Sequence, residues 1–172
     1  MNLAIRRATE ADAALLPEMA LKIFLDTFGE QNRREDIELH AARSYAPEIQ
    51  LAELRDTSKV YLVAEADGEP AGFAMVGEPE SESCFAFDLP VELFRFYVDK
   101  AGHGRGVAKP MMDEVEKIAR ALGGRTICLG VWEHNTRAIR CYEKAGFRDA
   151  GSQPYTLGEN LQTDRVMVRE LA

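Results

Sequence analysis

The sequence predicts an α/β fold in which helices cover one mixed sheet. Strand-like and helix-like segments follow one another along the whole chain, and no repeat, linker or low-complexity stretch separates them. The length of 172 residues suits one domain with a sizeable core. The composition, 46% hydrophobic and 29% charged, is that of an ordinary globular protein. We therefore expect residues 1–172 to form a single domain.

The chain should begin with one strand and three helices. Leu3–Arg6 alternates weakly, as a short strand does, and Thr9 is a suitable N-cap for a helix that runs towards Thr27. Pro17 interrupts the apolar periodicity of that helix, which predicts a kink or a late start. Two further short helices are expected, over Glu35–Ala42 and Pro47–Leu54.

The middle of the chain reads as three strands. Val60–Ala64 and Ala71–Val76 are strand-like and flank the turn signal Asp67–Pro70, so they predict a β-hairpin. Val91–Val98 is rich in β-forming residues and should be the next strand. A glycine-rich turn, Gly102–Gly106, then leads into a helix that Gly123 ends. The remaining elements are expected to be a strand over Arg125–Trp132, a helix from Asn135 to Gly146, a turn region over Gly151–Pro154, and a closing strand over Thr163–Leu171.

Charge and hydropathy exclude some partners. With 21 basic and 29 acidic residues the formal net charge is -8, which disfavours nucleic-acid binding and is mildly favourable to a cationic substrate. No stretch approaches the ~20 apolar residues that span a bilayer, and the N-terminus has no apolar run of signal-peptide length. Membrane association is therefore not expected, and the default location is the cytoplasm.

The three cysteines fit that location. The chain has an odd number of cysteines without CxxC spacing, namely Cys84, Cys128 and Cys141. We therefore expect reduced, buried thiols and no disulfide framework or zinc site. No metal is expected.

The glycine-rich turn has the features of a phosphate site. A strand, a glycine loop and a helix N-terminus direct backbone N–H groups and a helix dipole at one point, and Arg105 and Lys109 add cations there. The pattern GxxxxGK[ST] of the ATP-binding P-loop is absent. Val107 occupies the position of the third glycine of a dinucleotide-binding GxGxxG. Taken alone, three glycines that make a tight turn would explain the segment equally well.

Two motifs carry a resemblance to a known family. His103-x-x-Gly106-x-Ala108 resembles the coenzyme A signature (Q/R)-x-x-G-x-(G/A) of the GNAT superfamily of N-acetyltransferases. Asn135-x-x-Ala138-x-x-x-Tyr142-x-x-x-Gly146-Phe147, about thirty residues later, looks like the second signature of that family. The resemblance implies a mostly antiparallel, twisted sheet of about six to seven strands flanked by helices. It also implies acetyl-CoA as co-substrate and an amine as acceptor.

The resemblance also implies which residues bind the cofactor. The strand edge Phe96–Val98 would pair with the pantetheine arm, and the N–H groups from Gly104 to Lys109 would hold the pyrophosphate. Asn135 would meet the cofactor near the pantetheine. In full, the cofactor-binding residues would be Phe96, Tyr97, Val98, His103, Gly104, Arg105, Gly106, Val107, Ala108, Lys109, Asn135, Ala138 and Tyr142.

The sequence departs from the family pattern at three positions. His103 replaces the usual glutamine or arginine, and Pro110 removes one N–H donor from the first turn of its helix. Phe94 stands where many relatives carry a glutamate, which leaves the general base open.

Amine acetylation needs a base and an acid. Only about one alkyl amine in 2,500 is neutral at pH 7, so the site needs a base that takes the amine's proton or surroundings that lower the amine's pKa. Glu92, on the same strand face as Phe94 by the two-residue period, is the first choice, and Glu133 is the rival. A backbone N–H near Phe96 would stabilise the oxyanion. By the resemblance, Tyr142 would protonate the leaving thiolate.

The acceptor is less determined. Phe24–Phe28, Leu129–Asn135 and Gln162–Asp164 look like segments of the bacterial spermidine/spermine acetyltransferases, which implies a polyamine acceptor. The acceptor residues would then be Asp26, Phe28, Trp132 and Glu133. Protein or peptide amino groups and other small amines stay open as acceptors. A non-catalytic module that binds acetyl-CoA or a partner is the alternative from another class. The last strand and the exposed helix faces would support a homodimer, and nothing in the spacing decides the oligomeric state.

Overall fold

The computed structural model describes all residues from Met1 to Ala172 and contains one seven-stranded sheet. The helices are α1 (Leu15–Phe28), α2 (Arg34–Ser44), α3 (Pro47–Arg55), α4 (Ala108–Ala121) and α5 (Thr136–Lys144). The strands are β1 (Leu3–Arg7), β2 (Lys59–Ala66), β3 (Glu69–Gly77), β4 (Pro90–Val98), β5 (Thr126–Trp132), β6 (Arg148–Leu157) and β7 (Asn160–Glu170). Three short 3-10 turns, η1 (Glu10–Asp12), η2 (Glu82–Ala86) and η3 (Lys100–Gly102), complete the elements.

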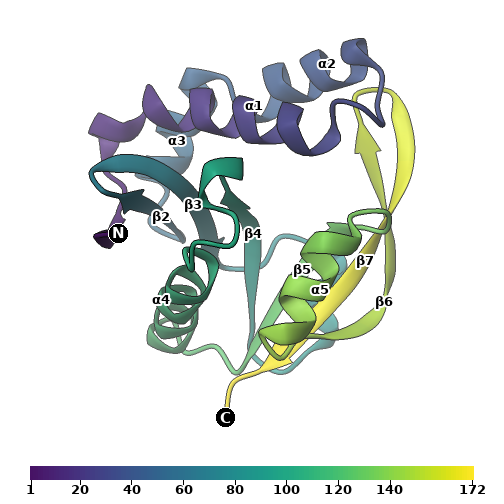
Figure 1. The fold of residues 1–172 in the computed structure, drawn as a ribbon. Coiled ribbons are helices and arrows are strands. Elements are labelled where there is room, and N and C mark those ends of the chain that lie inside the picture. The colour runs from purple at the N-terminus through teal and green to yellow at the C-terminus, as the bar shows by residue number, and fades with distance from the viewer.

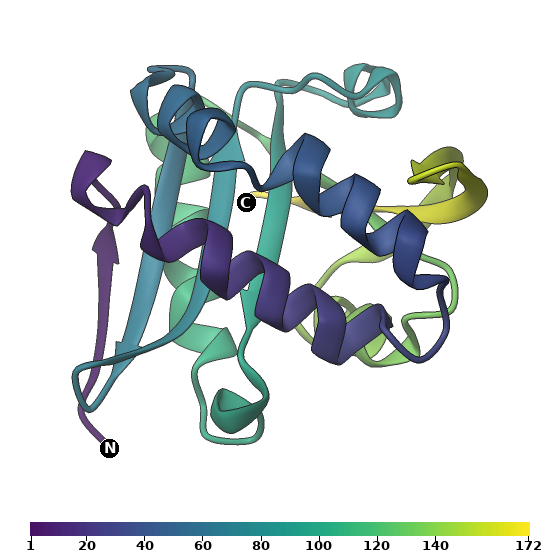
Figure 2. The same ribbon diagram turned by 90° about the horizontal axis from the view of Figure 1, so that it is seen from above.

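The strands lie in the order β1-β2-β3-β4-β5-β7-β6, and only β4 and β5 run parallel. The predicted mixed, mostly antiparallel sheet is therefore confirmed. Helices α1, α2 and α3 cover one face, while α4 and α5 lie on the other (Figures 1 and 2). No helix is long and apolar enough to cross a membrane.

The two sides of the sheet have separate cores because strand side chains alternate between faces. On β2, Leu62 and Ala64 pack in the larger cluster with α4, whereas Tyr61 and Val63 pack in the cluster with α1 and α2. On β3, Phe73 and Met75 pack on the α1 side, whereas Ala74 and Val76 pack on the α4 side. The cores fix both helical layers to the sheet.

The parallel pair β4–β5 is short. Its register covers only Pro90–Glu92 against Thr126–Cys128, and beyond these residues the two strands separate (Figure 1). Strand β4 also contains an irregularity: Leu93 faces Val76 and Arg95 faces Met75, so the register with β3 skips Phe94. Such a bulge bends a strand and changes where its groups point. The sheet therefore opens between β4 and β5.

Several expected elements are confirmed, with shifted ends. The strand at Leu3, the helices near residues 35 and 47, the hairpin, and the helices before Gly123 and Gly146 are all present. Thr9 caps only the short η1, and the long helix begins late, at Leu15. A proline in its first turn, Pro17, is compatible with this start because the N–H groups there have no intrahelical partner.

Two expectations are wrong. Gly151–Pro154 is not a turn region but lies inside β6, where Gly151 has a φ of 139° and the register with β7 shifts beside it. The turn comes later, between Leu157 and Asn160. The cysteines were expected to be reduced, but Cys84 of η2 and Cys128 of β5 form a disulfide, which leaves Cys141 as the free thiol. Their Cα atoms are 5.6 Å apart across 44 residues of sequence, a proximity that spacing rules do not reveal.

Candidate active site

A cleft of about 910 Å³ occupies the opening between β4 and β5. Strand residues Leu93–Val98 and Gly130–Trp132 form its sides, and α1, α4, α5, β6 and β7 contribute the rest of its lining. The cleft has two ends of different chemistry. One end is formed by the turn before α4 and by α5, and the other by α1 and the β6–β7 hairpin.

The turn before α4 presents a row of unused donors. Helix α4 has no side-chain N-cap. The backbone N–H groups without a hydrogen-bond partner in the protein are those of Gly104, Gly106, Val107, Ala108 and Lys109. The N–H of Arg105 differs, since it donates to the carbonyl of Gly102 at 3.2 Å. These donors converge at the positive end of a 14-residue helix, which is an arrangement that binds phosphate groups.

Glycine is required at two positions of this turn. Gly104 and Gly106 have φ angles of 73° and 79°, in the left-handed region that strains residues with a Cβ. No atom lies within 4 Å of the position that a Cβ would take at either residue. The glycines therefore shape the backbone and keep the space in front of it open.

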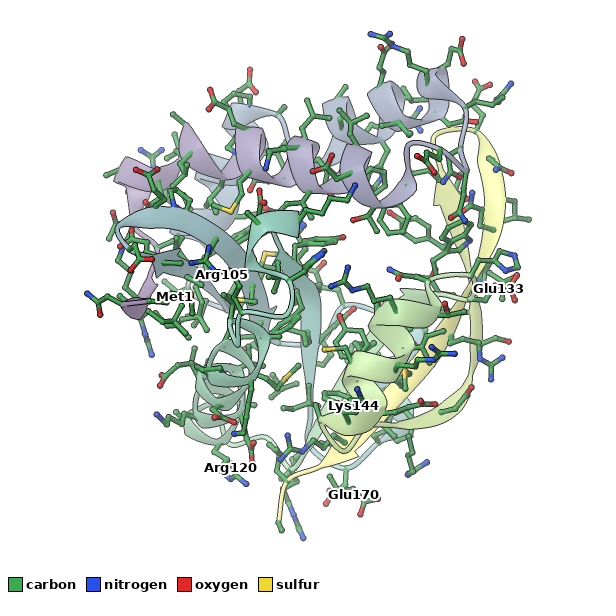
Figure 3. The ribbon with its side chains drawn as sticks, viewed as in Figure 1. Met1, Arg105, Arg120, Glu133, Lys144 and Glu170 are labelled. Carbon is green, nitrogen blue, oxygen red and sulfur yellow. A yellow bond between two sulfur atoms is a disulfide. The ribbon has the colours of Figure 1, made fainter.

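Of the two cationic residues predicted at this turn, only Lys109 lines the cleft, and Arg105 does not. Lys109 lines the cleft and pairs with Asp113 at 2.8 Å. Arg105 is not among the lining residues of the cleft. Its guanidinium lies 3.6 Å from the carboxylate of Asp67 (Arg105 is labelled in Figure 3). The His103 Nε2 lies 2.8 Å from the carbonyl of Val98, and burial lowers the pKa of this imidazole. His103 thus fixes the turn to the end of β4.

Helix α5 forms the other wall of this end. Asn135 caps it by accepting a hydrogen bond from the N–H of Ala138 at 3.2 Å, and both residues line the cleft. Tyr142, one turn further on, is 8% exposed and lines the cleft, and no hydrogen bond of the protein contributes to the pKa shift of its hydroxyl. Its ring meets Phe96 edge-on at 6.1 Å, and burial raises the pKa of its hydroxyl. A protonated hydroxyl therefore faces the strand edge Phe96–Val98, which also lines the cleft.

The carboxylate predicted as base is held by a loop. Glu92 lines the cleft, but its carboxylate accepts hydrogen bonds from the N–H groups of Glu80 at 2.7 Å and Ser81 at 2.9 Å. The hydroxyl of Ser81 donates a third bond at 2.5 Å. These bonds anchor the segment before η2 to β4. The role of Glu92 as base stays a prediction.

Three of the four predicted acceptor residues lie at the other end. Asp26 and Phe28 of α1 and Trp132 of β5 line the cleft, and the rings of Phe28 and Trp132 meet edge-on at 5.6 Å. Glu133 is not among the lining residues. It lies 3.5 Å from His134 at the outer edge of the molecule (Figure 3).

Sequence reasoning missed several residues of this end. Arg95 lines the cleft with its charge paired to Glu53 at 2.8 Å. His40 of α2 stacks on Phe24 at 4.7 Å and meets the hydroxyl of Tyr155 at 3.2 Å, and burial lowers its pKa to about 4. Asp164, which the sequence indicated only as part of the segment Gln162–Asp164, is 8% exposed in the cleft, and burial raises its pKa to about 6. Their separation along the chain left no local signal.

No group of three or more His, Cys, Asp or Glu side chains is placed to hold a metal ion.

A family model settles the classification. The model of the acetyltransferase (GNAT) family matches residues 18–147, about three quarters of the chain. The chain belongs to the GNAT family. This GNAT protein is therefore an acetyl-CoA-dependent N-acetyltransferase, as the two signatures predicted, and not only a binding module.

Curated relatives and solved structures agree with this classification. An uncharacterised N-acetyltransferase of Mycobacterium tuberculosis is 36% identical over 118 residues, 69% of this chain and 71% of that protein. The spermine/spermidine N(1)-acetyltransferase of Bacillus subtilis is 28% identical over 159 residues, 88% of this chain and 100% of that protein. The crystal structure of the PaiA N-acetyltransferase of Thermoplasma acidophilum in complex with coenzyme A shares the fold. It has a TM-score of 0.81 and 23% identity over 99% of this chain and 100% of that one.

Proposed function

We propose that this GNAT enzyme acetylates a primary amino group of a polyamine. The observation that carries the proposal is the acidic and aromatic character of one end of the cleft. Asp26 and Asp164 supply negative charge, and Phe28 and Trp132 supply ring faces and edges. A carboxylate beside aromatic rings favours an alkylammonium ion through charge attraction and cation–π contact. Two carboxylates in one cleft, exposed Asp26 and largely buried Asp164, suit a ligand with more than one amino group.

The similarity to the Bacillus subtilis spermine/spermidine enzyme supports the same acceptor class. The net charge of -8 acts in the same direction, since it attracts a polycation. Protein or peptide amino groups and other small amines are the alternatives.

The cofactor fits the other end. The free N–H groups of Gly104, Gly106 and Val107–Lys109 would hold the pyrophosphate of acetyl-CoA, and the edge Phe96–Val98 would pair with the pantetheine arm. Asn135 and Ala138 would border the thioester arm from α5. His103 would act through its bond to the Val98 carbonyl, which orients the turn. In this arrangement, the acetyl group reaches the middle of the cleft, between the two ends.

The reaction is a direct attack of the neutral amine on the thioester carbonyl. An N–H exposed near the bulge at Phe94 would stabilise the oxyanion. Tyr142 would give its proton to the leaving thiolate, because it lines the cleft and burial, which raises the pKa of its hydroxyl, keeps it protonated at neutral pH. The sequence predicts two candidate bases. Glu92 has three hydrogen-bond donors on its carboxylate, and Glu133 lies outside the cleft lining.

The cytoplasmic location and the homodimer stay predictions.

The first experiment is a panel of acceptors. Acetyl-dependent release of coenzyme A is followed by product mass with spermidine, spermine, lysine peptides and amino sugars. We expect saturable turnover with spermidine or spermine and little with the other amines. Turnover only with lysine peptides or amino sugars would overturn the polyamine proposal while leaving the N-acetyltransferase activity intact.

A further inference from the structure

The feature that carries a further inference is Asp164, in the middle of β7. In the sheet register it lies directly opposite Trp132 of β5 and Gln153 of β6. Directly opposite residues of antiparallel strands point to the same face, so these three side chains form one row. All three line the cleft, and the contact of Trp132 with Phe28 places the row under α1.

Asp164 is a largely buried residue whose carboxylate reaches the cleft. The residue is 8% exposed and lines the cleft, and burial alone shifts its pKa, with no contribution from a hydrogen-bond donor of the protein. The other two carboxylates of the cleft differ from it, because Glu92 has three donors and Asp26 is exposed on α1. The Asp164 carboxylate is therefore open to the cleft, where a ligand can supply the donor that the protein does not.

The backbone of β5 makes room for this carboxylate. Gly130 lies two residues before Trp132, on the same strand face. A Cβ at Gly130 would come within 2.6 Å of the Gln153 Nε2 and 3.1 Å of the Asp164 Oδ2. Any larger residue would push both side chains aside. The glycine therefore preserves the space that the Asp164 carboxylate occupies.

No cation of the protein neutralises Asp164. The titratable and charged side chains around this end of the cleft are Asp26 of α1, His40 of α2, Arg95 and Tyr97 of β4, His134 after β5 and Tyr155 of β6. Arg95 is occupied by Glu53, by the Tyr61 hydroxyl and by the carbonyl of Ser44. His40 is neutral at pH 7, because burial lowers its pKa to about 4. Burial alone raises the pKa of Asp164 to about 6, which leaves it ionised at pH 7 but a stronger base than an exposed carboxylate.

We propose that Asp164 is the general base, which binds the acceptor's ammonium group in the cleft and takes one of its protons. This inference rests on the proposed acetylation of an amine. An N–H bond of the ammonium breaks and its proton moves to the Asp164 carboxylate, so the nitrogen lone pair is free to attack the thioester carbonyl. As the tetrahedral intermediate collapses, the C–S bond breaks and Tyr142 protonates the thiolate. The nitrogen's second proton restores the Tyr142 hydroxyl, and Asp164 then releases its proton to solvent.

The test is the pH dependence of kcat/KM for spermidine in the wild type and in Asp164→Asn. If the panel selects another amine, that amine replaces spermidine. The kcat/KM of the wild type should rise with pH, with an apparent pKa near 6, and then level off. Asp164→Asn should be about 10²–10³-fold slower at pH 7. The pH profile of this variant should lack the rise near pH 6. Its kcat/KM should instead increase about tenfold per pH unit towards pH 9.5, because the neutral amine becomes abundant.

Matched variants separate the base from a general loss of structure. Asp149→Asn makes the same change on β6, where Asp149 pairs with Arg165 outside the cleft, and should retain the wild-type profile. Coenzyme A affinity should be the same in wild type and Asp164→Asn. Calorimetric binding of spermidine to the free enzyme should weaken in Asp164→Asn, since the ammonium loses its carboxylate.

Three outcomes would overturn the inference. Asp164→Asn could stay within about threefold of the wild type at pH 7. It could be slower by the same factor at every pH, which would make Asp164 a binding residue and not a base. The step near pH 6 could vanish in Glu92→Gln and persist in Asp164→Asn, which would assign the base to Glu92. A wild type that turns over no amine would instead refute the proposed function, and that result needs no variant.

Discussion

The two ends of the cleft are built from different parts of the chain and from different chemical groups. The cofactor end uses main-chain N–H groups of a continuous segment, Gly104–Lys109, together with one face of α5. The acceptor end uses side chains from α1, α2, β4, β5, β6 and β7, and its charged centre, Asp164, lies 136 residues after Phe28. A backbone site tolerates change in most side chains, whereas a side-chain site changes its ligand with a single substitution.

This difference explains how one fold can keep its cofactor and vary its acceptor. The donors of the turn before α4 exist whenever glycines allow its φ angles. The row formed by Trp132, Asp164 and Gln153 exists only because three strands hold it in register. Substitutions at the two ends should therefore separate cofactor affinity from acceptor affinity.

The largest effect is expected where the two ends meet, at Tyr142. Tyr142→Phe removes the hydroxyl but keeps the ring that packs on Phe96 and Phe147. We expect kcat to fall about 10²–10³-fold, because the thiolate loses its proton donor. Coenzyme A affinity, measured by calorimetry, should be unchanged. An unchanged kcat would remove Tyr142 from the mechanism and leave the acid unassigned.

A smaller effect is expected at the cofactor end. Gly106→Ala forces a Cβ onto a residue with φ of 79°, which costs about 1–3 kcal/mol and distorts the donors of the turn. The Kd for coenzyme A should rise about tenfold to a hundredfold, while the KM for spermidine at saturating acetyl-CoA should not change. Gly123→Ala is the matched control, since Gly123 has φ of 80° but lies outside the cleft. Equal losses of coenzyme A affinity in both variants would contradict a cradle at Gly106.

The complementary change at the acceptor end is Phe28→Ala. It removes a ring that contacts Phe24 at 4.6 Å and Trp132 at 5.6 Å. The KM for spermidine should rise about fivefold, as expected for the loss of about 1 kcal/mol of aromatic contact, with coenzyme A affinity unchanged. Phe85→Ala, an exposed ring on η2, should change neither constant. If Phe28→Ala altered coenzyme A binding instead, the two ends would not be separable.

The smallest effect is on stability. The pKa of Asp164 is higher in the folded protein, about 6, than in an unfolded chain, so its ionisation destabilises the fold as the pH rises from about 4 to 6. Asp164→Asn removes this penalty and should raise Tm by about 2–6 °C at pH 7.5 but not at pH 4. Thermal unfolding at both pH values measures this. In Asp149→Asn, Tm should not rise, because Arg165 lowers the pKa of Asp149. A rise in Tm of Asp164→Asn at both pH values would argue against a charge penalty.

Much of the fold could be predicted because its elements have local causes. The helical spacing of Met111, Val115 and Ile118 predicts α4, and the β-forming residues of Val91–Val98 predict β4. Strand β6 was missed since Gly151 and Pro154 are turn signals in isolation. Pairing of nine of its residues with β7 outweighs those local preferences, as tertiary context often does for strands.

The sequence by itself determined the cofactor end. A glycine loop before a helix fixes its N–H groups by local dihedral angles, and the helix signature of Asn135–Phe147 is equally local. The tertiary structure decided everything that depends on long-range pairing. It placed Asp164 beside Trp132 in the cleft, bonded Glu92 to the segment before η2, joined Cys84 to Cys128, and left Glu133 outside the cleft. The physical reason is that burial and partners set the charge state and reach of a carboxylate, and both follow from strand register.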